Sequence, residues 1–146
     1  MTDAPSLDDT PFEVTVLENG SEATWSLHAH RNPDRQIELT LHFTADQTWT
    51  TRGTDFFGLL MSLRELVEPS GILICCNGAR INAWSSGMQR DMGVGHMVYL
   101  LEEGERSSRP QMLPTWGPVN SADVVTLSEQ STWHQASLSQ EPETSG

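Results

Sequence analysis

Three histidines and a glutamate form the first group whose residue types and spacing could support chemistry. His28 and His30 lie two positions apart, so their side chains share one face of a β-strand, and His42 falls on the matching face of the next strand. With Glu38 they could ligate zinc. If the intervening turn closes a hairpin, however, His28 falls opposite Glu38 or Thr40 and His42 lies farther along the ladder. The chain lacks paired Cys motifs and an H-E-x-x-H helix, so we expect a solvated sheet face, without metal or cofactor.

The sequence supports nucleophilic catalysis even less than it supports a metal site. Cys75 and Cys76 are adjacent in an apolar run, whereas a reactive thiolate requires exposure and a basic neighbour. We expect buried, reduced thiols, because a disulfide between neighbouring strand residues requires a strained turn. Ser86, Asp91 and His96 can be drawn as a triad, but their order and spacing match no serine-hydrolase motif. The sequence therefore predicts no catalytic residue.

Length and charge restrict the class of protein. The chain has 146 residues, enough for one domain with a core, and its formal net charge is −12. An acidic surface disfavours nucleic-acid binding and suits either solubility or a basic protein partner. The N-terminus lacks the basic and apolar regions of a signal peptide, and no apolar run approaches the roughly 18 residues of a membrane span. We expect a cytoplasmic protein without a membrane segment, which agrees with reduced cysteines.

Alternation of apolar and polar residues predicts an antiparallel meander of three strands. The alternating segments are residues 12–17, 23–30 and 36–43. Asn19-Gly20, between the first two segments, is a strong hairpin signal because both residues tolerate positive φ. One face of this meander is apolar and the other polar, so the apolar face requires a covering element.

A helical period follows the strands. Between residues 54 and 71, the apolar residues recur at intervals of three and four positions and therefore share one face of an α-helix. These residues are Phe56, Leu59, Leu60, Leu63 and Val67. Thr54 is the expected N-cap, and Pro69 and Gly71 end the helix. We expect this helix to cover the apolar face of the meander.

Strand patterns return after the helix. Residues 71–77 form a continuous apolar run, typical of a strand that is central or buried on both faces. Residues 79–84 and 96–103 predict further strands, and residues 122–128 predict a final edge strand. The expected fold is a single α+β domain over residues 12–130, with a mostly antiparallel sheet and one principal helix packed on one face.

The two ends of the chain offer little to bury. Residues 1–11 predict a flexible N-terminus, and residues 131–146 predict a disordered acidic tail that can be removed without loss of folding. Trp116 and Trp133 fall in predicted loop or tail segments. A tryptophan at such a place is either tucked under the domain or available to a partner.

The segment "CNGARINAWSSGMQRDMGVGHMVYLLEEG" concentrates glycine and methionine. Ser85, Ser86 and Gly87 introduce a short helical turn, which Gly93 and Gly95 end. The pattern C-N-G-A-R, S-G-M, D-M-G-x-G and V-Y resembles one in small bacterial proteins encoded beside secreted polymorphic toxins, which are similar to immunity proteins. The resemblance covers about residues 56–104. It implies that the feature that defines these proteins is formed by Arg80, Ser86, Met88, Arg90, Asp91 and Met92.

The leading hypothesis is a non-catalytic cytosolic binding protein of the immunity type, which occludes a basic toxin domain. The candidate partner contacts are the six residues of the resemblance together with Trp116. The alternative is an accessory or adaptor subunit of another bacterial complex, and a small enzyme or metal-binding protein ranks third. A structural alternative also stays open for the segment itself, because glycine and methionine can simply solve a tight packing problem at a corner.

Overall fold

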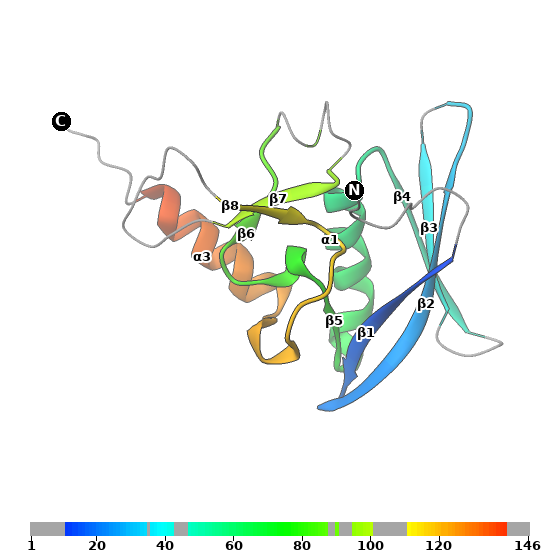
Figure 1. Cartoon of the computed structure of the whole chain (residues 1–146), viewed down its shortest axis with the longest axis horizontal. Coiled ribbons are helices and arrows are strands. Elements are labelled where there is room, and N and C mark those ends of the chain that lie inside the picture. Colours follow the sequence, from blue (N-terminus) through cyan, green and yellow to red (C-terminus); the bar gives the residue numbers. More distant parts are fainter. Residues whose placement is uncertain are drawn as a thin grey trace.

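Two antiparallel sheets, with helices beside them, make up the computed structural model of the chain (Figure 1). The fold is α+β and mostly sheet, as the sequence predicts. The structure describes residues 11–34, 36–42, 47–87, 90, 95–100 and 111–139. Within these residues no helix is long and apolar enough to cross a membrane.

The larger sheet has five strands in the order β4-β3-β2-β1-β5, and all neighbours are antiparallel. The strands are β1 (Phe12–Glu18), β2 (Ser21–Arg31), β3 (Ile37–His42), β4 (Thr48–Gly53) and β5 (Ile72–Cys75). The predicted meander is confirmed as β1 to β3, with Asn19 and Gly20 at positive φ in the first hairpin. Strand β4, which the sequence pattern did not predict, extends the meander by one strand.

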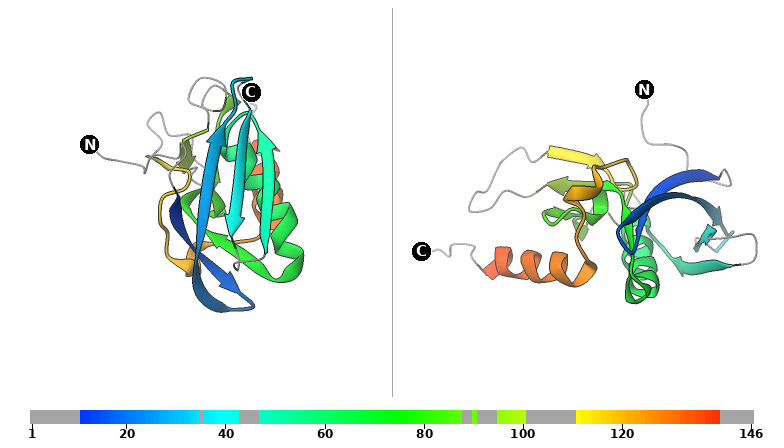
Figure 2. Two further views of the ribbon diagram at one scale, coloured as in Figure 1. Left: turned by 90° about the vertical axis from the view of Figure 1, so that its right-hand side faces the viewer. Right: turned by 90° about the horizontal axis from the view of Figure 1, so that it is seen from below.

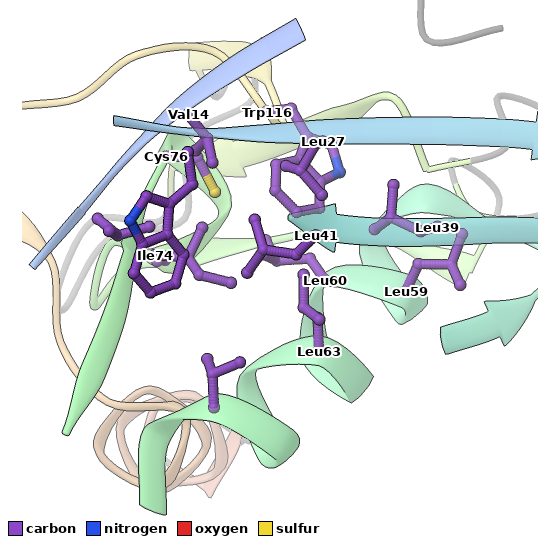
Figure 3. Packing of buried hydrophobic residues seen from close by; sticks show 14 of the residues in the cluster. Val14, Leu27, Leu39, Leu41, Leu59, Leu60, Leu63, Ile74, Cys76 and Trp116 are labelled. Carbon is purple, nitrogen blue, oxygen red and sulfur yellow. The ribbon is translucent and has the colours of Figure 1, made fainter. Parts of the chain in front are cut away.

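Helix α1 (Phe56–Val67) covers the inner face of this sheet, and a 3₁₀ turn over Glu68–Ser70 continues it (Figures 1 and 3). The predicted apolar face is confirmed, because each of its five residues is at most 1% exposed. The predicted N-cap is wrong by one position. Asp55 has extended backbone geometry and its Oδ1 accepts a hydrogen bond from the Gly58 N–H at 2.7 Å, so Asp55 and not Thr54 caps the helix.

Strand β5 lies at an edge of the sheet, so of the two alternatives that its apolar run predicted, the central position is wrong and burial on both faces is right. It pairs with β1. Ile74 and Cys75 point to opposite faces of the strand, and both belong to the main core cluster. The same cluster contains Trp116 from a distant part of the chain (Figure 3). The burial of β5 therefore comes from packing above and below the strand rather than from strands on both sides.

The smaller sheet contains β6 (Ala83–Trp84), β7 (Met97–Leu100) and β8 (Gln111–Pro114), in the order β6-β7-β8. A strand within residues 79–84 is confirmed, although its partner is β7. Residues 96–103 also contain the expected strand, as β7. The final edge strand predicted for residues 122–128 is wrong, since Ser121–Asp123 is a 3₁₀ turn and a single bridge joins Val124 to Arg80.

Helix α3 (Leu127–Ser139) includes residues 131–139 of the predicted disordered tail, which are therefore helical (Figure 1). Its start has a capping box, in which Thr126 Oγ1 accepts from the Glu129 N–H at 3.1 Å and Glu129 Oε1 accepts from the Thr126 N–H at 3.0 Å. The pKa of the Glu129 carboxyl is lowered by these hydrogen bonds from Thr126. The helix is nearly unpatterned in hydrophobicity, which explains why the apolar period did not reveal it. Residues 140–146 and 1–10 lie outside the described residues.

The two cysteines are buried free thiols, as predicted. Burial raises the pKa of the Cys76 thiol to about 12, and it also raises the pKa of Cys75. Because the thiolate is the reactive form, we expect both cysteines to react slowly with a thiol reagent in native buffer and rapidly after unfolding. Rates measured with a chromogenic disulfide with and without urea test this. Rapid native titration of both thiols would contradict it.

Candidate functional site

An open groove of about 390 Å³ lies where the end of β4 meets α1 and the start of α3. These three elements are separated in the sequence, and the fold brings them together. Polar, charged and apolar side chains all contribute to its lining. The lining residues are Arg52, Gly53, Thr54, Asp55, Gly58, Leu59, Met61, Ser62, Glu65, Arg90, Leu127 and Ser131.

An ion pair between Asp55 and Arg90 forms one wall of the groove. Arg90 Nε lies 3.1 Å from Asp55 Oδ1 and 3.0 Å from Oδ2, and the guanidinium lies 5.8 Å from the centroid of the Phe57 ring. The Asp55 side chain is 7% exposed and the Arg90 side chain 36% exposed. Because Asp55 also accepts from the Gly58 N–H, its carboxylate fixes the helix start and the arginine together, and does not have the open geometry of a general base.

Arg90 and Gly95 both lie against the N-terminus of α1. The Arg90 N–H donates to the Ser86 carbonyl at 2.9 Å, a bond between residues four positions apart as in an α-helix. Gly95 has φ of +71°, and a Cβ there would lie 2.6 Å from the Phe57 backbone nitrogen. Only glycine permits this conformation and approach together. The next residue, His96, stacks on Phe56 with 4.7 Å between the ring centroids.

The structure describes four of the seven predicted partner contacts, namely Arg80, Ser86, Arg90 and Trp116. Ser86 and Arg90 lie in the same turn, whereas Arg80 is half-buried elsewhere and donates from Nε to Asn77 Oδ1 at 3.2 Å. Trp116 is 6% exposed and packs edge-on against Phe12, so it is tucked under the domain and is not a surface contact. The remaining three predicted residues, Met88, Asp91 and Met92, lie outside the described residues.

The outer face of the large sheet carries the predicted histidines. His28 lies opposite Thr40, one of its two predicted partners, and His42 lies opposite Ser26, two positions farther along the ladder. Glu38 forms an ion pair with Arg52, with 2.7 Å between Oε2 and Nη2. Among the described residues, no three His, Cys, Asp or Glu side chains are grouped as metal ligands.

A buried polar network, which sequence reasoning missed, anchors α3 to α1. Arg64 is fully buried, and it donates to Glu68 Oε2 at 3.0 Å, to the Val125 carbonyl at 2.7 Å and to Gln130 Oε1. Gln130 Nε2 in turn donates to the carbonyls of Gly78 and Ala83. The signal in the sequence was an arginine on the apolar face of α1, four residues after a core leucine.

A ring stack forms the second attachment of α3. His134 lies parallel to Trp84, with 3.9 Å between the centroids, and Trp84 meets Phe57 edge-on at 5.3 Å. Burial lowers the pKa of the His134 imidazole, because the charged form loses its hydration. The stack therefore connects α3 to the same helix start that Arg90 contacts.

Substitutions at the start of α1 test the position of its cap. Asp55→Ala should lower the free energy of unfolding by about 1–2 kcal/mol, because it removes the acceptor of the Gly58 N–H. Asp55→Asn keeps a capping oxygen and should cost less, while it loses the charge that holds Arg90. Thr54→Ala is the matched control, with an expected change within about 0.5 kcal/mol. Urea melts measure all three, and a larger loss for Thr54→Ala would contradict the assignment.

Comparison of the chain with protein-family models and with curated proteins finds no match.

Proposed function

We propose that the chain is a non-catalytic protein of the immunity type, which inhibits a toxin by occluding its active site or substrate groove. The proposal rests on the negative net charge of the chain. The net charge is −12, and three of the described arginines are already neutralised within the fold, in the pairs Arg52–Glu38, Arg64–Glu68 and Arg90–Asp55. Exposed carboxylates such as Glu13 and Glu65 have no described arginine against them. A surface of this kind attracts a basic partner and speeds its association.

The groove wall supports binding rather than catalysis. Asp55 is occupied by Arg90 and by the Gly58 N–H, and Cys76 is a buried thiol with a raised pKa. We place the protein in the cytoplasm, where an inhibitor would protect the cell that makes the toxin and where free thiols such as Cys75 persist.

Co-expression with the products of adjacent open reading frames tests the proposal. A neighbouring gene for a large secreted protein with a variable C-terminal domain would supply the candidate toxin. We expect that domain alone to arrest growth, the chain to restore growth, and the purified complex to weaken as salt increases. A neighbouring product that binds the chain without arresting growth would favour an accessory subunit instead. A chain that turns over a small molecule would contradict both.

A further inference from the structure

Strand β4 is an open edge that leads into the groove. It pairs with β3 on one side, and in the described part of the chain no strand lies on its other side (Figure 2, left). Its sequence, TWTTRG, contains no proline, and its one charged residue, Arg52, is paired with Glu38 of the neighbouring strand. In an antiparallel ladder, alternate residues direct their N–H and C=O groups away from the neighbouring strand. Such an edge can accept an extended segment as a further strand.

The groove lies at the end of that edge. Arg52 and Gly53, the last residues of β4, line it together with Ser62 and Glu65 of α1. A segment added along β4 would therefore run between the strand edge and the helix, and one of its side chains would enter the groove. Its volume of about 390 Å³ lies in the range of pockets that hold ligand groups.

The charges of the groove identify the kind of side chain that fits. Arg52 is paired with Glu38 and Arg90 with Asp55, so their charges cancel. Glu65 remains, an exposed carboxylate with no described arginine against it. The partly exposed apolar lining residues Met61 and Leu127 can cover the aliphatic stem of a long basic side chain, while its cationic end reaches the carboxylate.

We propose that β4 and the groove receive an extended basic segment of the partner protein by strand addition, with one lysine or arginine side chain held against Glu65. The nature of the partner rests on the proposed function. The site itself does not, because its recognition elements are a strand edge, a groove and one carboxylate.

A synthetic peptide tests the site on the full chain. The probe is a fluorescein-labelled nonapeptide of alternating arginine and valine, measured by fluorescence anisotropy at low ionic strength. We expect saturable binding in the micromolar range, and at least about tenfold weaker binding when alternate backbone nitrogens are methylated, because methylation removes the strand donors and keeps the charge. Equal binding of the two peptides, or none by the first, overturns the proposal.

Matched variants then locate the peptide. Glu65→Arg and Glu13→Arg both reverse an exposed charge, but only Glu65 lines the groove. We expect Glu65→Arg to weaken binding about tenfold or more, and Glu13→Arg to change it by less than about threefold. Ser62→Trp fills the groove and should weaken binding, whereas Leu66→Trp, on the exposed part of α1, should not. Circular dichroism confirms that each variant is folded, and equal losses within either pair overturn the proposal.

The outcome is separable from that of the toxin experiment. In one outcome, the unmodified chain and its Glu65→Arg variant restore growth equally well, and the peptide does not bind. The strand-addition site is then wrong and the inhibitory function stands. If the peptide binds as expected and no neighbouring product arrests growth, the site stands and the immunity function is wrong.

Discussion

Replacement of Arg64 by leucine is expected to lower the free energy of unfolding by about 3–5 kcal/mol, because it leaves buried partners without their charged donor. Arg64 is fully buried, and its guanidinium serves Glu68, Gln130 and the Val125 carbonyl at once. Leucine fills part of the space but satisfies none of these acceptors. Urea-induced unfolding followed by tryptophan fluorescence measures the change.

Two further variants determine whether the loss comes from unpaired polar groups. Arg52→Leu removes an arginine from an exposed ion pair with Glu38, and it should cost at most about 1 kcal/mol. Glu68→Leu alone and combined with Arg64→Leu completes a double-mutant cycle, and the two losses should be less than additive because both variants break the same ion pair. A small loss for Arg64→Leu alone would show that the network contributes little to stability.

Truncation after Gln130 is expected to cost roughly 2–5 kcal/mol, although the sequence predicted that this tail is dispensable. The deletion removes most of α3, so Gln130 loses the helix that positions it between Arg64 and the carbonyls of Gly78 and Ala83. Each buried group left unsatisfied costs about 1–3 kcal/mol. The lost stack of His134 on Trp84 adds about 0.5–1.5 kcal/mol.

Point variants within α3 separate the two attachments. Gln130→Ala should account for most of the loss, and His134→Ala for the smaller share that belongs to the ring stack. Thr132→Ala, at an exposed position of the same helix, should stay within about 0.5 kcal/mol of the unmodified chain. Thermal melts of the truncated chain provide a direct comparison. An unchanged melting temperature would mean that α3 contributes nothing to the fold.

Local pattern in the sequence was sufficient for the elements that form the core. The alternation of residues 12–43 predicted β1 to β3, and the three-and-four spacing from Phe56 to Val67 predicted the buried face of α1. The burial of Cys75 and Cys76 followed from their apolar run. These properties are local, because a side chain's face depends only on its position within its own helix or strand.

The sequence pattern did not predict the elements that lack an apolar period. Strand β4 contains four threonine or arginine residues in TWTTRG, and it becomes a strand because β3 offers it an open edge. Helix α3 was read as a disordered tail since its attachments are polar, through Gln130 and His134. Its local signal was the capping box of Thr126 and Glu129.

By itself, the sequence determined the α+β class, the meander, the buried face of α1 and the acidic net charge. Tertiary structure alone decided that Arg90 reaches Asp55 across 35 positions, that Trp116 is buried, and that β4, α1 and α3 enclose one groove. The physical reason is that residue type and spacing specify local conformation, whereas the meeting of distant segments depends on packing. At Gly95 that packing requires a positive φ and a close backbone approach, which no residue period encodes.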